Sequence, residues 1–319
     1  MKMDLRLFIC LFLMLSVVGC TSKDNKKADD TTAIPAQPKN FERIFPPAIM
    51  SDTQERASYM LEHFWDKFDF RDTTYCVTTE NNNVPAVAEQ AFVDFLSLCP
   101  YVPYSKVHAV VKKLLDSAQV DVVMYNYFYK KGEHYLYNPN SPMRNDEYFI
   151  PFLEHVVSST KVVEDDKVLP KYQLELAYKN RVGSKALDLA YTLNSGSTGN
   201  LYGINAQYVL LMFYNPDCVE CHHTAAALKN STSVSAAVDS GKLKVLAVYP
   251  DEKLSVWKEH LKDFPASWIN GYDKNLAVRN KEIYDLKAIP TLYLLDKDKK
   301  VILKDTSTGH VHEYFEKNP

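Results

Sequence analysis

Two cysteines separated by two residues follow an apolar run, and this pattern constrains the fold more than any other feature of the chain. Residues 209–214 have the length and composition of a buried strand, and Cys218 and Cys221 follow it after a short loop. Cys218 would begin a helix, where unpaired backbone N–H groups and the helix dipole favour a thiolate. Cys221 would lie about one turn further on, close enough to attack a mixed disulfide formed by Cys218. The spacing therefore predicts reversible thiol–disulfide chemistry at a strand-to-helix junction.

A second signal is the tripeptide Ile289, Pro290 and Thr291, which opens the apolar run 292–295. A proline just ahead of a strand often follows a cis peptide bond in a tight turn. We expect strands at 186–191, 209–214, 243–249, 291–295 and 301–303, and helices at 218–229, 255–261, 275–284 and 312–317. This alternation predicts an α/β layered sheet flanked by helices.

The chain before this sheet has helical periodicity. Apolar residues recur three and four positions apart, as at 59–68, 92–96 and 107–115. With 319 residues, the chain is long enough for two domains. We expect a mainly α-helical domain at 41–180 and the α/β domain at 181–319. Aromatic residues crowd 125–137, where they would form either core or a binding groove, and core is the commoner use of such residues.

The N-terminus has the character of an export signal. Lys2 and Arg6 precede the apolar stretch 7–18, which is shorter than a membrane span and ends at Gly19 and Cys20. This ending resembles the lipobox of bacterial lipoproteins, which implies a signal peptide at 1–19 and lipidation of Cys20; the alternative is a signal peptide cut elsewhere.

Residues 20–40 are polar and would form a flexible tether. We expect a cell-envelope location, lipid-anchored to a bacterial membrane and facing the periplasm or the cell surface.

An envelope location permits disulfides outside the Cys-x-x-Cys motif. Cys76 and Cys99 would close a loop of 23 residues, which stabilises a fold by about 3 kcal/mol in chain-entropy terms. The alternative is two separate buried thiols, and sequence alone does not fix the pairing. The net charge of −3 gives no indication of nucleic-acid binding.

The C-terminal part of the chain resembles the thioredoxin-like proteins of bacterial envelopes, the membrane-anchored thiol–disulfide oxidoreductase type. The Cys-x-x-Cys motif and the proline loop carry this resemblance. It implies that Cys218 is the exposed nucleophile and Cys221 the resolving thiol. It also implies that Pro290 is a cis-proline which, with Ile289 and Thr291, positions the partner chain.

The chain also departs from the thioredoxin pattern. Asp217 stands where many relatives have an aromatic residue, and Met212 stands where thioredoxin has a buried acid. The segment 133–147 resembles the marker of a helical domain of unknown function that precedes such redox domains. No activity carries over from that second resemblance.

Charged neighbours are expected to tune the thiols. Asp217 and Glu220 flank them with negative charge, which disfavours a thiolate. A less stable thiolate favours the disulfide and makes the couple more reducing. His222 would offset this effect only when protonated. We therefore expect the poise of a reductase or isomerase.

Three other interpretations of the same cysteines are open. The sequence C-x-x-C-H is also the c-type haem motif, but a haem protein requires neither the apolar strand nor the proline loop. Cys218, Cys221, His222 and His223 could ligate a metal, although adjacent histidines project differently from a helix and structural zinc takes two pairs from separate segments. A static disulfide is disfavoured because a C-x-x-C loop is small and strained. We expect no metal and no organic cofactor.

The sequence therefore predicts a thiol–disulfide oxidoreductase, a reductase or isomerase. Its expected partners are disulfide-containing exported proteins, a membrane electron donor, and the membrane itself through the lipid anchor. The alternative is a non-catalytic envelope lipoprotein whose helical domain binds a partner and whose thiols sense oxidation.

Overall fold

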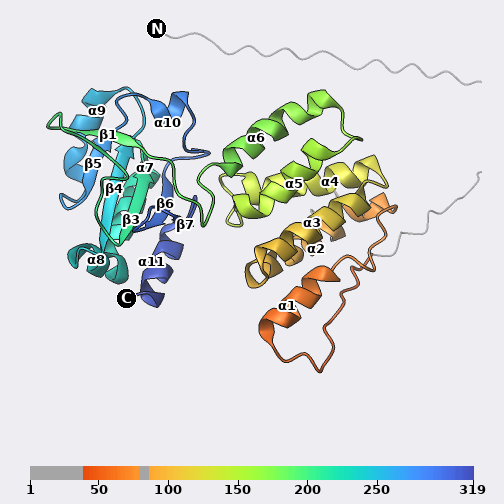
Figure 1. The fold of residues 1–319 in the computed structure, drawn as a ribbon. Helices are drawn as coiled ribbons and strands as arrows, with labels where there is room; N and C mark the ends of the chain where they lie inside the picture. The colour runs from red at the N-terminus through yellow and green to blue at the C-terminus, as the bar shows by residue number, and fades with distance from the viewer. Residues whose placement is uncertain (1–38, 79–85) are drawn as a thin grey trace, which may run out of the picture. The chain divides into compact units, whose positions relative to one another are not determined.

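A computed structural model describes residues 39–78 and 86–319, in which a run of helices precedes a sheet flanked by further helices (Figure 1). The expectations for the signal peptide, for Cys20 and for nearly all of the tether lie outside the described residues. Within the described ranges, no helix is long and apolar enough to cross a membrane.

The first part of the described chain is helical. Its helices are α1 (Thr53–Glu62), α2 (Val87–Leu98), α3 (Tyr104–Ala118), α4 (Val122–Gly132), α5 (Asp146–Ser158) and α6 (Val168–Tyr178). Side-chain caps fix three of the starts, because Asp52, Asp121 and Asn145 accept backbone N–H groups at the first turns of α1, α4 and α5.

One aromatic core holds these helices together. Phe92, Phe95, Phe128, Phe149 and Phe152 are fully buried in it. The aromatic-dense stretch 125–137 also packs on this core, so its residues are core residues and not a separate groove. A π-helical turn (Glu133–Tyr137) continues α4 and carries the end of that stretch.

The second part contains a seven-stranded mixed sheet with the order β2-β1-β5-β4-β3-β6-β7. Its strands are β1 (Ala190–Leu193), β2 (Thr198–Asn200), β3 (Tyr208–Phe213), β4 (Leu243–Tyr249), β5 (Ile269–Tyr272), β6 (Thr291–Asp296) and β7 (Val301–Leu303). The pairs β3–β4 and β4–β5 are parallel, and the others are antiparallel. Strands β3 and β4 are buried on both faces, which explains their continuous apolar sequences.

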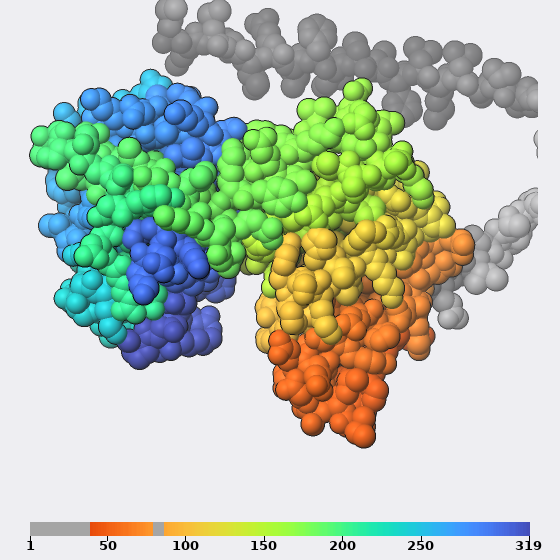
Figure 2. All heavy atoms as spheres, viewed as in Figure 1, coloured from red at the N-terminus to blue at the C-terminus, as the bar shows by residue number. Residues whose placement is uncertain are grey.

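Helices cover one face of the sheet more completely than the other. The helices α7 (Val219–Asn230), α8 (Thr232–Asp239), α9 (Leu254–Glu259) and α11 (Thr308–Lys317) contribute to one buried cluster with Leu210, Met212 and Val245. The short α10 (Ala277–Asn280) and the segments around Leu189 and Leu201 pack on the opposite face. The space-filling view shows the chain around residues 160–190, in green, between the earlier helices, in yellow and orange, and the later part of the chain, in teal and blue (Figure 2).

Several sequence-based boundaries were wrong. The first strand begins at Ala190 and not at 186, because residues 186–189 form irregular backbone; the Ala186 N–H, for example, donates to Lys299 O. The helix expected at 275–284 is only α10, since Leu276 and Glu282 adopt left-handed backbone conformations on either side of it. The last helix starts at Thr308, and β2, β5 and α8 were missed.

Candidate functional site

The two cysteines lie where β3 leads into α7. Cys218 is the N-cap of α7 and is partly exposed, whereas Cys221 is completely buried. The backbone N–H of Cys221 donates to Cys218 Sγ at 3.3 Å, and the N–H of Asn215 donates to Cys221 Sγ at 3.5 Å. Each sulfur therefore accepts one backbone N–H, Cys218 from the first turn of α7 and Cys221 from the loop that precedes the helix.

Burial distinguishes the inner thiol from the outer one. Burial raises the pKa of Cys221 well above its usual range, and the contact with Cys218 adds to the effect. Cys221 is consequently a neutral thiol near neutral pH. The accessible sulfur belongs to Cys218, and the buried sulfur lies one helical turn behind it.

The proline loop faces Cys218. The Ile289–Pro290 peptide bond is cis, in agreement with the expectation from the sequence. The Cys218 thiol lies 3.6 Å from the carbonyl oxygen of Ile289, to which it donates. Thr291 begins β6 and its hydroxyl donates to the carbonyl oxygen of Ala288, inside the loop. The fold thus brings the Cys-x-x-Cys motif and the proline loop together.

The residues expected to tune the thiols surround the helix start. The side chains of Asp217 and Glu220 are 67% and 74% exposed, so solvent screens their charges. Glu220 lies 3.4 Å from His223, while Asp217 lies 3.7 Å from His260, a residue that the sequence did not single out. His222 Nε2 is 2.7 Å from the carbonyl oxygen of Pro216.

A partly buried amide, Asn270, lies on the sheet and contacts two aromatic residues of the core near this site. Met212 is buried, as expected, and brings no acid to the strand. Asn270 from β5 accepts hydrogen bonds at Oδ1 from Tyr214 Oη at 2.7 Å and from Trp257 Nε1 at 3.2 Å. Tyr214 belongs to the same buried cluster as Cys221. The missed strand β5 therefore supplies a polar side chain, Asn270, that is hydrogen-bonded to the buried cluster containing Cys221.

The other two cysteines are separate thiols, and the bridge considered from the sequence is not formed. Cys76 Sγ lies 3.5 Å from Met124 Sδ, and Cys99 Sγ lies 3.7 Å from the carbonyl oxygen of Phe95. Burial raises the pKa of Cys76 to about 11 and that of Cys99 to about 12. Both are therefore protonated and poorly reactive near neutral pH.

A hollow of about 310 Å³ adjoins the proline loop. Ile289 and Asn215 line it from the redox site, and Val278 lies on its apolar wall. Tyr172 and Leu176 of α6 line it from the helical part of the chain. The hollow is therefore lined by side chains from both the helical part and the loops of the redox site.

Buried ion pairs join the proline loop to the start of α5. Lys287 Nζ lies 2.9 Å from Asp146 Oδ1 and 2.6 Å from Asp285 Oδ2. Lys304 Nζ lies 2.9 Å from Asp146 Oδ2. These side chains are between 3% and 7% exposed. Sequence reasoning missed this network; the only signal was that Asp146 lies in the segment 133–147.

Burial and ion pairing shift the carboxyl pKa values in opposite directions here, and the outcome differs between Asp146 and Asp305. Burial alone would raise the pKa of Asp146, but Lys287 and Lys304 outweigh it and the pKa is lowered. Arg144, just before α5, makes a second ion pair with the C-terminal part of the chain: its Nε lies 2.8 Å from Asp305 Oδ2. In that pair burial dominates, and the pKa of Asp305 is raised despite the guanidinium.

These features are those of a thioredoxin-like protein with a helical domain in front. Residues 19–180 match the family model described as a domain of unknown function, DUF5106, and residues 205–301 match the model described as thioredoxin-like. A thioredoxin-like protein from Bacteroides caccae ATCC 43185 is 43% identical to the chain in a match covering 88% of this chain and 100% of that one, with a TM-score of 0.81. The chain belongs to the thioredoxin-like proteins that carry a DUF5106 domain.

Two shorter solved structures match the C-terminal part. One is the C-terminal domain of an uncharacterized protein from Bacteroides fragilis NCTC 9343, at 50% identity, covering 43% of this chain and 98% of that chain with a TM-score of 0.42. The other is a domain of a possible thiol-disulfide isomerase from Cytophaga hutchinsonii ATCC 33406, at 26% identity, covering 44% and 95% with a TM-score of 0.39. No curated protein matches the chain.

Proposed function

We propose that the chain is a thiol–disulfide oxidoreductase that reduces or isomerises disulfides in exported proteins. The observation that carries this proposal is the pairing of a partly exposed Cys218 with a buried Cys221, opposite a cis-proline loop. A nucleophile needs access to the substrate, whereas a resolving thiol needs only to reach the nucleophile.

The proposed reaction has two exchange steps. The Cys218 thiolate attacks one sulfur of a substrate disulfide, the substrate S–S bond breaks, and one substrate sulfur leaves as a thiolate. Cys221, on losing its proton, then attacks Cys218 Sγ and displaces the second substrate sulfur. The substrate gains two electrons and two protons, and Cys218 and Cys221 become a disulfide. Further turnover requires a dithiol donor, which we assign to a membrane electron donor.

The surroundings of Cys218 suit a peptide partner. The hollow beside Ile289 has an apolar wall at Val278 and Leu176, and the exposed Tyr172 lies at its helical side. An extended segment whose cysteine reaches Cys218 would lie along the proline loop and place a neighbouring side chain in this hollow. In this proposal the DUF5106 domain takes part in selecting substrates.

Trapping distinguishes catalysis from a binding lipoprotein with sensor thiols. We expect Cys221→Ser to accumulate a mixed disulfide with an oxidised peptide at Cys218, whereas Cys218→Ser forms none. The matched control is Cys76→Ser, which removes a half-buried thiol remote in sequence from the motif. Mass spectrometry after acid quenching reports each adduct. Retained reductase turnover in Cys218→Ser would contradict the mechanism, and oxidation without turnover in the wild type would favour the sensor.

A further inference from the structure

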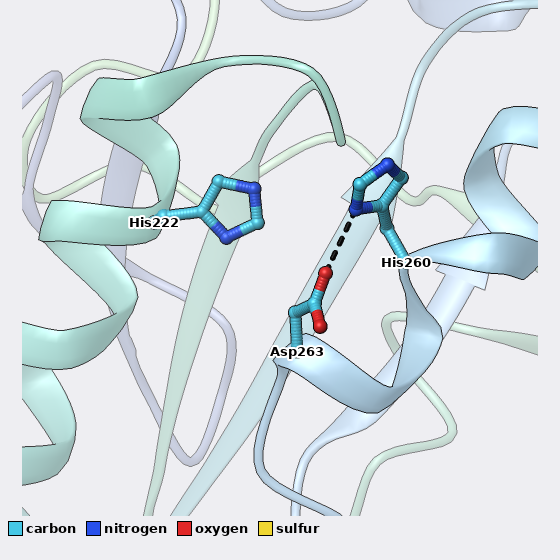
Figure 3. A group of neighbouring side chains, drawn as sticks. All are labelled: His222, His260 and Asp263. Atoms are coloured by element: carbon cyan, nitrogen blue, oxygen red, sulfur yellow. Dashed lines mark hydrogen bonds and ion pairs between the residues drawn. The ribbon is translucent and has the colours of Figure 1, made fainter.

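Three side chains beside the Cys-x-x-Cys motif form a compact group of metal-ligating types: His222, His260 and Asp263 (Figure 3). His222 comes from the first turn of α7, His260 directly follows α9, and Asp263 ends the short helical turn Leu261–Asp263. One donor atom of each side chain lies within 4.8 Å of the other two. Figure 3 shows the His222 ring across a gap from the paired His260 and Asp263.

The hydrogen bonding of His222 leaves its Nδ1 available to bind a metal ion. Its Nε2 lies 2.7 Å from the carbonyl oxygen of Pro216, which can only accept a hydrogen bond. This contact assigns the proton to Nε2 and leaves a free lone pair on Nδ1. Histidines that bind metals commonly have their second nitrogen held in this way by a carbonyl or carboxylate.

His260 lies between two carboxylates. Its Nδ1 is 2.8 Å from Asp263 Oδ2, and its Nε2 is 3.7 Å from Asp217 Oδ1. If Nδ1 binds a cation together with Asp263, the ring proton resides on Nε2, and a small shortening of the 3.7 Å separation lets Asp217 accept it. Asp217 would then fix the orientation of the ring from outside the metal site.

The spacing and the charges suit a divalent transition metal. Zinc binds imidazole nitrogen and carboxylate oxygen at about 2.0–2.2 Å, which places tetrahedral ligands roughly 3.3 Å apart. The His260 Nδ1–Asp263 Oδ2 separation of 2.8 Å has to widen slightly to that value, and the other separations, at most 4.8 Å, have to shorten by roughly 1–1.5 Å. The His260 and Asp263 side chains are each 32% exposed and free to make these movements. Asp263 and Asp217 together supply two negative charges for the dication.

We propose that His222 Nδ1, His260 Nδ1 and Asp263 Oδ2 bind one Zn²⁺ ion, with water as the fourth ligand. This site uses neither thiol, so it differs from the cysteine–histidine set that the motif itself suggests. It also does not depend on the proposed redox function. Because His222 follows Cys221 directly, a bound dication would place positive charge next to the thiols and favour the dithiol form.

The test is zinc titration of the full chain carrying Cys218→Ser and Cys221→Ser, which prevents the motif thiols from binding the metal. We expect one saturable site by isothermal titration calorimetry. In the same background, His260→Ala and Asp263→Asn should each weaken binding at least about tenfold. His223→Ala is the matched control, because His223 is 68% exposed and faces Glu220; it should leave the affinity unchanged.

A second readout identifies the ligands without relying on any loss of affinity. Zinc should shift the imidazole proton resonances of His222 and His260 but not those of His223. His260→Gln provides a milder variant, and circular dichroism establishes that each variant is folded. Absence of saturable binding, unchanged affinity in folded His260→Ala and His260→Gln, or an equal loss in His223→Ala would each overturn the site.

Discussion

Replacing Lys287 by methionine tests whether the buried ion pairs hold the proline loop against α5. The Lys287 ammonium lies between Asp146 and Asp285, and its side chain is only 3% exposed. Burial alone would lower the pKa of Lys287, but the two carboxylates outweigh it and raise the pKa above its usual range. The lysine is therefore charged, and Lys287→Met removes a charge on which both carboxylates depend.

The expected cost follows from what the variant leaves behind. Asp146 retains Lys304 at 2.9 Å, whereas Asp285 loses its 2.6 Å ion-pair partner while 7% exposed. Removing one partner of a buried pair costs about 3–5 kcal/mol. With a urea m-value of about 3 kcal/mol/M, the midpoint should fall by about 1–1.7 M. Asp285→Asn combined with Lys287→Met removes both charges and should recover most of this loss.

Urea unfolding can follow the two parts of the chain separately. Trp65 lies in the helical core, whereas Trp257 and Trp268 lie in the core beside the sheet. Single-tryptophan variants would report each transition by fluorescence, and Lys287→Met should separate transitions that coincide in the parent protein.

The matched control is Lys112→Met on α3. It breaks an ion pair to Asp116 whose side chains are 62% and 51% exposed, and it should change stability by no more than about 0.5 kcal/mol. A Lys287→Met cost no larger than the control, or a double variant no more stable than the single one, would refute the reasoning.

Three further predictions concern pH and substrate. Burial raises the pKa of Cys221, so only a small fraction of this thiol is ionised near neutral pH. Release of substrate from the mixed disulfide should therefore accelerate roughly tenfold per pH unit through pH 7–9, because the thiolate fraction rises by that factor below the pKa. Quenched-flow mass spectrometry checks this, and a flat profile would contradict it. The folded pKa of Asp146 is lowered, so its stabilisation is present above the unfolded value of 3.8 and is lost as pH falls below it through the folded pKa; the stability gap between wild type and Asp146→Asn in urea should narrow there. Tyr172→Ala should raise KM for a disulfide-bonded peptide roughly fivefold, about 1 kcal/mol, and leave reduction of a small disulfide unchanged; equal effects on both substrates would exclude a role in the hollow.

Local chemistry explains which parts of the fold were predictable. The apolar sequence of β3 reflects burial on both faces, and the position of Cys218 as an N-cap follows from the residues around it. The sequence of β5, by contrast, contains Asn270 and Gly271, which are typical of turns. These residues form a strand because β4 and β1 pair with them on either side. Tertiary pairing overrides local preference in such a segment.

The residues of the candidate site also fall into two groups, those with a local sequence signal and those without one. The cysteines and Pro290 could be selected as candidates because each signal is contained within a few neighbouring residues. His260 and Lys287 were missed because their partners, His222 and Asp146, come from distant parts of the sequence. No local pattern marks a lysine that will be buried, since lysine is ordinarily an exposed residue.

The buried ion pairs also indicate what the helical domain does for the redox site. A well-packed apolar contact often stabilises a fold as well as a buried ion pair does, so stability alone does not account for this arrangement. Charges differ from apolar groups because a displacement that separates Lys287 from Asp146 leaves both uncompensated. Lys287 lies two residues before Ile289, whose carbonyl oxygen is 3.6 Å from Cys218 Sγ. Under the proposed function, we expect the network to hold the proline loop in place relative to α5, and with it the surface that a substrate would meet beside Cys218.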